Sequence, residues 1–197
     1  MTDPDRERQA SPQALRALAH PLRWRLLDVL ETEVSATATR CAQLTGESVA
    51  SCAYHLGILA KYGYAAQQSD TPGREKPWRL VSRRQDLSSA GLDTEGTLAA
   101  EAATEAFLDH ELVRLKSRLR EADRQPPQWR PWFHGTTTVL TDAEYLHVRE
   151  QVEQTVGRLM EEYADRDTDP ARRPADGRPV RLFIAASAAL SGTGDNP

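Results

Sequence analysis

The hydrophobic positions between residues 48 and 64 repeat with the period of an α-helix. Five apolar residues are spaced 4, 3, 3 and 3 apart: Val49, Ala53, Leu56, Leu59 and Tyr62. This spacing keeps them on one face. Ser48 is a typical N-cap residue, and Gly63 follows the last turn, where a left-handed residue commonly ends a helix. The pattern predicts an amphipathic helix with its apolar face toward a core.

Three further helices are predicted before it. Ser11-Pro12 reads as an N-cap followed by proline at the first helical position, and His20-Pro21 ends that helix and starts the next. The second helix carries Trp24, which we interpret as packing beneath the fold rather than binding a ligand. Thr37 or Thr39 can cap a third, with Cys41, Ala42 and Leu44 as its apolar residues. The third and fourth helices are separated by a short turn containing Gly46. Two such helices form either a helix-turn-helix or an ordinary αα-hairpin.

A β-hairpin is predicted directly after this helix pair. Residues 64–68 and 74–81 are strand-like and flank a turn-rich loop, residues 69–73. A helix-turn-helix followed by a hairpin is a winged helix, and Arg74 and Lys76 would lie at the tip of the wing, where they could reach phosphates or a minor groove. Trp78 or Leu80 should face the core, and Arg79 should face solvent.

The charge is divided unevenly along the chain. Of 197 residues 39% are apolar, and the net charge is −4. Residues 40–84 hold seven Lys/Arg and three Asp/Glu, a balance of +4, whereas residues 85–197 hold thirteen against twenty, a balance of −7. The basic part could meet a polyanion while the acidic part keeps the protein soluble.

Several classes of protein are disfavoured by composition. No apolar run is long enough to span a membrane, and the charged start of the chain does not resemble a secretory signal, so we expect a cytoplasmic location. Cys41 and Cys52 are too few for a disulfide framework and are interpreted as buried thiols. We find no phosphate loop, nucleophile motif or metal-ligand cluster. We therefore expect no enzyme activity, no cofactor and no metal; Asp109-His110 and His147-x-x-Glu150 are interpreted as structural or solvated.

Residues 14–84 resemble the ArsR-type winged-helix transcriptional regulators. The resemblance rests on ALRALAHPLRWRLLDVL, on CAQLTGESVASCAYHLGILAKYGY with its HL-x-x-L (His55, Leu56, Leu59), and on the hairpin through REKPWRLV. The remainder is more loosely similar to the long C-terminal extension of an actinobacterial-type subgroup.

The resemblance implies a homodimer that binds double-stranded DNA at a pseudo-palindromic operator and usually represses. By position, the DNA-binding residues would be Ser48, Ala50, Ser51, Tyr54, His55, Lys61, Arg74, Lys76 and Arg79. No Arg, Asn or Gln stands at the start of the recognition helix. Because these residues are the commonest bidentate readers of bases, we expect modest sequence discrimination, or help from the wing and from DNA shape.

A long helix is predicted over residues 97–123, which contain no Pro or Gly. Leu108, Leu112, Leu115 and Leu119 step 4, 3 and 4, as in the seam of a coiled coil. The alanine-rich first half would pack closely. The seam either packs on its own domain or forms the dimer, and the resemblance favours the dimer.

The last third is predicted to form a small α+β accessory region. Trp129, Trp132 and Phe133 either plug a small core, which we favour, or line an apolar effector pocket. Residues 136–140 and 180–186 are strand-like and could pair. A capping box at Thr141 starts a helix to about residue 163, with the apolar face Tyr145, Val148, Val152, Val156, Leu159 and Tyr163.

The fold class expected is therefore mainly α (α+β). Its parts are a disordered tail (1–10), a winged helix-turn-helix (11–84), a linker and dimerisation helix (85–124), an accessory region (125–190) and a loose tail (191–197). The function expected is that of a homodimeric DNA-binding regulator; the resemblance implies repression, and control by a small-molecule effector is left open. The alternative is a winged helix that binds other proteins and not DNA.

Overall fold

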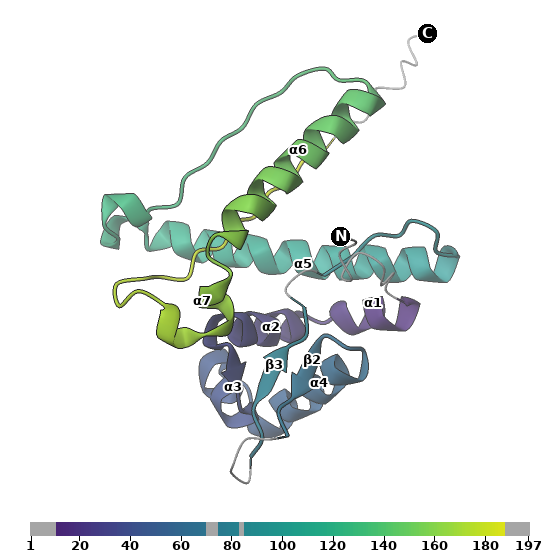
Figure 1. The fold of residues 1–197 in the computed structure, drawn as a ribbon. Helices are drawn as coiled ribbons and strands as arrows, with labels where there is room; N and C mark the ends of the chain where they lie inside the picture. The colour runs from purple at the N-terminus through teal and green to yellow at the C-terminus, as the bar shows by residue number, and fades with distance from the viewer. Residues whose placement is uncertain (1–10, 70–74, 83–84, 188–197) are drawn as a thin grey trace.

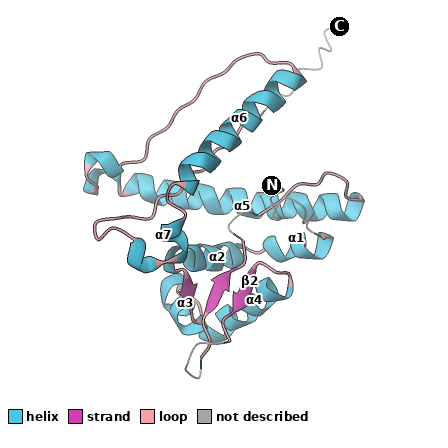
Figure 2. Cartoon of the chain, in the orientation of Figure 1, coloured by secondary structure: helices cyan, strands magenta, loops and turns pink. Residues whose placement is uncertain are grey.

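The computed structural model describes residues 11–69, 75–82 and 85–187. It is mainly helical, with a small antiparallel sheet (Figures 1 and 2). The α-helices are α1 (Pro12–Leu18), α2 (Pro21–Glu33), α3 (Ala38–Thr45), α4 (Val49–Lys61), α5 (Thr94–Arg120), α6 (Asp142–Glu161) and α7 (Asp165–Thr168). Short 3-10 turns lie at Ala122–Arg124, Pro127–Trp129 and Pro170–Arg172. No helix among the described residues combines the length and apolar composition needed to cross a membrane.

The predicted helix starts are confirmed by their caps. The Ser11 hydroxyl accepts from the Ala14 N–H at 3.2 Å, and the Ser48 hydroxyl accepts from the Ser51 N–H at 3.1 Å. Of the two candidate threonines, Thr37 caps α3 by accepting from the Arg40 N–H at 3.2 Å. Each cap satisfies one N–H that has no partner within its helix.

The core lies between α1, α2, α3, α4, the sheet and the first half of α5. Its largest fully buried side chains are Leu15, Leu18, Leu26, Leu30, Leu56, Leu59, Cys41 and Cys52. Trp24 is also buried, and its indole N–H donates to the Leu18 carbonyl at 2.7 Å, which confirms its interpretation as a packing residue. Burial of Cys41 and Cys52 is confirmed as well.

The sheet consists of β1 (Ser35–Ala36), β2 (Ala65–Gln67) and β3 (Trp78–Leu80), in the order β1-β3-β2. The β2–β3 pairing confirms the predicted hairpin, and β1 pairs with the other side of β3. Trp78 and Leu80 pack against the core while Arg79 is exposed, as expected.

Helix α5 matches the predicted long helix, shifted three residues toward the N-terminus. Its alanines Ala99, Ala100 and Ala103 are buried against the body, where α5 lies along α1 and α2. Small side chains allow this close approach. The C-terminal end of α5 extends beyond that contact (Figure 1).

The region after α5 differs from the prediction. Residues 136–140 and 180–186 form no strand, so the expectation of an α+β region was wrong. Helix α6 does begin with the predicted capping box at Thr141, but none of its residues is buried, and it leans away from α5 (Figure 1). The β-branched residues at 136–140 had strand propensity without a neighbouring strand to pair with, and propensity alone does not make a sheet.

Candidate nucleic-acid interface

Helices α3 and α4 are joined by a tight turn. Gly46 ends α3 in the left-handed conformation, with φ of 74°, which glycine adopts without steric cost. The guanidinium of Arg25 on α2 donates to the Thr45 carbonyl and to the Glu47 carboxylate, the latter at 3.0 Å. The turn is therefore held from below by α2, and α4 has a fixed direction relative to α3.

The buried face of α4 differs from the predicted one. Cys52, Leu56 and Leu59 face the core, whereas Val49 and Ala53 are exposed. The Cys52 thiol lies 3.6 Å from the Thr45 hydroxyl of α3. Cys52, Leu56 and Leu59 are also spaced at helical intervals, so the signal was present once cysteine is counted as a small apolar residue.

The outward face of α4 carries most of the predicted DNA-binding residues of this helix. Ser48, Ala50, Tyr54 and Lys61 are exposed, with Tyr54 at 65%, and Ser51 is half-buried. Ala53 and Gly57 lie between them and are also exposed. A face of such small side chains lets a second molecule approach the helix backbone closely. The Ser48 hydroxyl already accepts a backbone hydrogen bond as the cap, so it can still act as a donor.

His55 is less available than the sequence suggested. Its ring is half-buried and lies 4.3 Å from that of His20, centroid to centroid. Its Nδ1 accepts from the Arg23 Nε at 3.3 Å. Burial lowers the pKa of His55, and the charges of His20 and Arg23 lower it further. The structure thus places His55 at the contact between α4 and the start of α2.

Among the residues of the hairpin that the structure describes, one cation is clearly exposed. Arg79 on β3 is exposed and donates to its neighbouring Leu80 carbonyl at 3.3 Å. Lys76 is half-buried, and Arg74 lies outside the described residues. The carboxylate of Glu75 accepts from the Thr39 N–H of α3 at 2.9 Å. This contact fixes the hairpin to the start of α3 and was not anticipated, because no local pattern pairs residues 36 positions apart.

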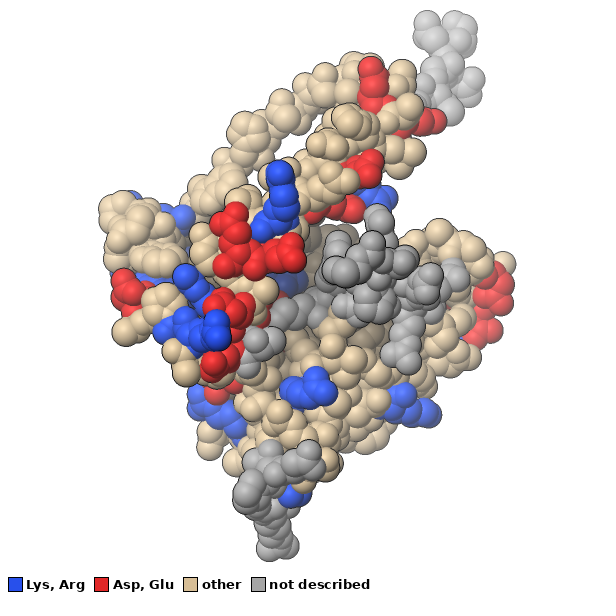
Figure 3. Space-filling view, viewed as in Figure 1, with Lys and Arg blue, Asp and Glu red and all other residues tan. Residues whose placement is uncertain are grey.

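The cations of α2 and α3 are largely committed to internal contacts. Arg23 donates to the Ala17 carbonyl at 2.6 Å, Arg25 holds the α3–α4 turn, and Arg40 pairs with Glu33 at 3.0 Å. In the view of Figure 3, Lys and Arg are scattered over the part formed by α3, α4 and the sheet, whereas most Asp and Glu lie around α5, α6 and α7. The candidate interface is therefore mildly rather than strongly basic.

The predicted seam of α5 lies outside the core. Leu108, Leu112 and Leu119 are exposed, and Leu115 is half-buried. One chain therefore leaves this row of leucines largely in water, at a cost that a partner surface would remove.

The three clustered aromatics form neither a core nor a pocket. Trp129, Trp132 and Phe133 are all exposed, Trp132 at 77%. The favoured interpretation as a core plug was wrong, and no enclosed effector pocket is built from them. Trp129 ends the short turn Pro127–Trp129, and Trp132 and Phe133 lie at the start of the irregular stretch that follows it, where no second layer covers them.

A charged network that sequence reasoning missed joins α2, α5 and the C-terminal segment. Asp28 pairs with His110 at 2.7 Å and with Arg114 at 2.5 Å. Arg181 pairs with Glu31 at 3.2 Å and with Glu111, only 3% exposed, at 2.7 Å. Burial alone would lower the pKa of Arg181, but the carboxylates of Glu111 and Glu31 raise it. The paired residues lie 70 to 150 positions apart in the sequence, so no local pattern could predict these pairs.

Metal and thiol chemistry find little support in the described part of the chain. No group of three His, Cys, Asp or Glu residues there could hold a metal ion. Burial raises the pKa of the Cys41 thiol to about 11, helped by Cys52 nearby, so the reactive thiolate is scarce at neutral pH.

Comparison with protein-family models and with curated proteins gives no match. The resemblance to ArsR-type regulators therefore stays a prediction from the motifs of the sequence.

Proposed function

We propose that this protein is a winged helix-turn-helix transcriptional regulator that binds double-stranded DNA as a homodimer. Helix α4 would be the recognition helix, the β2–β3 hairpin the wing, and the second half of α5 the dimer seam. Operators of such dimers have half-sites about one helical turn apart, roughly 34 Å. We propose repression as its mode of action by resemblance alone.

The exposed face of α4 carries the proposal. Ala50, Ala53 and Gly57 leave room for a groove wall, and Tyr54 and Lys61 flank them with a hydroxyl and an ammonium. No larger side chain of the described residues covers this face, although α4 is buried on its other side through Leu56 and Leu59. The α4 N-terminus adds backbone N–H groups and a positive dipole end that suit a phosphate.

The side chains on the exposed face of α4 determine the kind of DNA binding that we expect. Hydroxyl groups and a lysine contact phosphates more readily than they distinguish base pairs. The affinity should therefore depend strongly on salt and moderately on sequence, with part of the discrimination coming from groove width and DNA bending.

Charge-reversal variants test this proposal. Lys61→Glu and Arg79→Glu should each weaken binding to a promoter duplex and to an unrelated duplex, and each should flatten the salt dependence by about one unit of log–log slope. Arg158→Glu, an exposed site on α6, is the matched control and should change neither. Fluorescence anisotropy over a salt series measures both. Equal effects of all three reversals would contradict the proposed interface.

The second candidate, a protein-binding winged helix, is favoured by one observation. The exposed part of α4 has a single cation, Lys61. The arginines near it on α2 and α3 pair with other groups of the protein and add little free positive charge to this face. In that case Tyr54→Ala would abolish capture of a protein partner, and the wild-type chain would bind no duplex even at low salt. Binding to DNA at low salt that is lost at high salt would reject this candidate as the sole function.

A further inference from the structure

Helix α6 is amphipathic, but its apolar face has no partner in its own chain. The residues of this face repeat at helical spacing and are exposed or half-buried: Tyr145, Val148, Val152, Val156 and Leu159. The helix does not pack along any other helix or strand that the structure describes. Because most helices in proteins are stabilised by packing of such a face, a further surface is needed to cover it.

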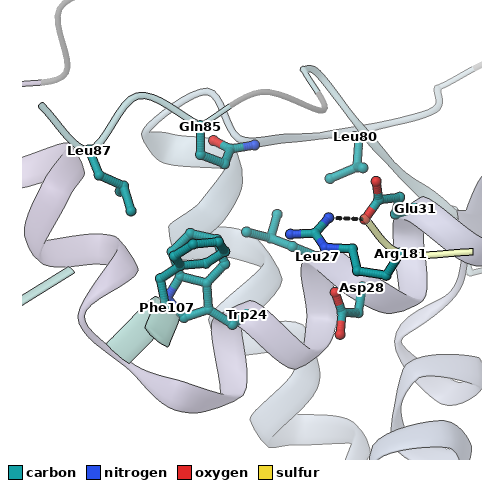
Figure 4. A pocket seen from close by; sticks show the side chains of 9 residues that line it. All are labelled: Trp24, Leu27, Asp28, Glu31, Leu80, Gln85, Leu87, Phe107 and Arg181. Atoms are coloured by element: carbon teal, nitrogen blue, oxygen red, sulfur yellow. Dashed lines mark hydrogen bonds and ion pairs between the residues drawn. The ribbon is translucent and has the colours of Figure 1, made fainter. Parts of the chain in front are cut away.

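The chain that follows α6 is fixed to the body on the side of α2. Arg173 donates to the Thr32 carbonyl at 2.7 Å. Arg181 lines a cavity of about 120 Å³ beside Trp24, and Figure 4 shows its guanidinium turned to Glu31, with which it pairs at 3.2 Å. From this fixed side α6 leans away from its own α5 (Figure 1). Its own chain therefore leaves the apolar face uncovered.

An apolar row of the same length is exposed on the second half of α5. Its members are exposed or half-buried: Leu108, Leu112, Leu115 and Leu119. This row runs over 12 positions, residues 108–119, and the α6 row from Val148 to Leu159 also runs over 12. Two helices with such rows can cover each other along their whole length.

The charges of the two helices are opposite in sign. Residues 108–120 of α5 hold four Lys/Arg and two Asp/Glu, a balance of +2, whereas α6 holds two against five, a balance of −3. Lys116, Arg118 and Arg120 are exposed and form no ion pair with another residue that the structure describes. Two α5 rows would bring positive charges together, and two α6 rows would bring negative charges together. The charges therefore favour α5 against α6.

We propose that α6 of one copy packs against residues 108–120 of α5 in a second copy. Each copy offers both rows, so a two-fold dimer makes the contact twice. We expect the helices to run antiparallel, because this brings Asp142 and Glu144 at the start of α6 to the basic end of α5. A parallel arrangement would place them beside Glu101 and Glu105. This interface rests on the homodimer of the proposed function and not on DNA binding.

Cross-linking between two different chains tests the interface without DNA. Full-length chains carrying Leu119→Cys and Val148→Cys are co-expressed with different tags, purified through both tags and treated with a short bismaleimide. Cys41 and Cys52 are fully buried and should react slowly. We expect a covalent heterodimer. Ser117→Cys, exposed on the opposite side of α5 from Leu119, replaces Leu119→Cys in the matched control and should lose the cross-link.

A chain that carries both cysteines distinguishes a second copy from the chain itself. Leu119→Cys combined with Val148→Cys should give covalent dimers, resolved by mass spectrometry, because the two positions meet only between copies. An internal link in a monomer would show that α6 folds onto its own α5.

Charge reversal provides an independent arm, because the sign of its effect depends on which rows meet. Lys116→Glu and Glu153→Lys should each raise the dimer dissociation constant about fivefold in sedimentation equilibrium, and the double variant should recover most of the loss. Glu150→Lys, exposed on the far side of α6 from its apolar row, is the matched control and should change it little. If α5 met α5, Lys116→Glu would instead tighten the dimer, and Glu153→Lys would tighten it if α6 met α6.

The proposed interface is overturned if the heterodimer does not cross-link, if the chain with both cysteines links internally, or if either reversal tightens the dimer. A chain that gives one of these results and still binds DNA as a dimer keeps the proposed function and loses only this contact. A wild-type chain that is monomeric loses both the contact and the proposed homodimer.

Discussion

The body formed by residues 11–69, 75–82 and 85–107 and the region from residue 108 onward both carry amphipathic helices, yet only the body buries its apolar faces. Leu15, Leu26 and Leu56 are fully buried in the body. Among the described residues from 108 onward, the only buried side chain is the carboxylate of Glu111. A helical stripe therefore predicts an apolar face but does not identify the surface that covers it.

The contact between the two regions is mainly polar. The C-terminal segment contacts the body largely through arginines: Arg181 binds Glu31, and Arg173 donates to the Thr32 carbonyl at 2.7 Å. One ring pair, Phe107 with Phe183 at 5.9 Å, adds to them. The body is thus held together by apolar packing, and its contact with the rest depends mainly on charge.

Leucine-to-alanine substitution in each region should show the largest difference. Leu26→Ala, at a fully buried site, should lower the free energy of unfolding by about 3 kcal/mol, because it removes apolar contacts and leaves a cavity. Leu159→Ala, at an exposed site on α6, should cost less than about 0.5 kcal/mol in a monomer. Urea denaturation at low protein concentration measures both. Similar losses would mean that α6 is packed after all.

Removal of the interregional arginine comes next in size. Arg181→Ala leaves the buried Glu111 without its partner, which should cost about 2 kcal/mol after allowing for the partial exposure of Arg181. Arg178→Ala, which removes only exposed contacts to Gln125 and Trp129, should cost little. Limited proteolysis should cut the C-terminal segment sooner in the first variant. Equal protection in both would show that the charged contact does not hold the segment.

The exposed leucines of α5 provide a test of the homodimer. Leu112→Glu introduces charge into the proposed seam, and it should raise the dimer dissociation constant at least about tenfold. Val113→Glu is the matched control, since Val113 is even more exposed but lies off the seam. Sedimentation equilibrium measures both. If the two variants dimerise equally well, or the wild-type chain is monomeric, the leucine seam is not the dimer contact.

The smallest expected effect is a difference in pH dependence. The pKa of His55 in the body lies below its ordinary value of 6.5. The contribution of neutral His55 to the free energy of unfolding is therefore present above pH 6.5 and is lost as the pH falls through the lowered pKa. The pKa of Glu144 in α6 lies below 4.5 because the Thr141 cap donates to its carboxylate, and that contribution is lost only at lower pH.

The body should therefore lose stability as the pH falls below 6.5 while the α6 cap stays intact. His55→Gln should reduce the fall in melting temperature over this range. Thr141→Ala should leave that fall unchanged and act only on helix content. An identical fall in His55→Gln and the wild-type chain would remove His55 as its source.

Local features of the fold could be predicted and distant ones could not. Ser11, Thr37, Ser48 and Thr141 were recognisable as caps because a cap requires only residues within the first turn. The pairing of β2 with β3 was accessible for a similar reason, since the two strands are close in sequence. By contrast, the absence of a strand at residues 136–140 depends on there being no partner nearby, which the segment itself does not encode.

The candidate site was predicted in part for the same reason. The exposure of Tyr54 and Lys61 follows from helical period alone. The inward turn of His55 depends on His20 and Arg23, which reach it from another helix. The cavity beside Trp24 required residues up to 157 positions apart to meet, from Trp24 to Arg181, and no pattern within the sequence indicated it.

Hydroxyl-radical footprinting of the full-length chain on its own promoter region tests the central proposal most directly. We expect two protected patches on one face of the duplex, about one helical turn apart, that fade as salt rises. This pattern would require both a DNA-binding α4 and a two-fold dimer. Uniform cleavage at low salt, with the chain folded and at saturating concentration, would contradict the proposed function.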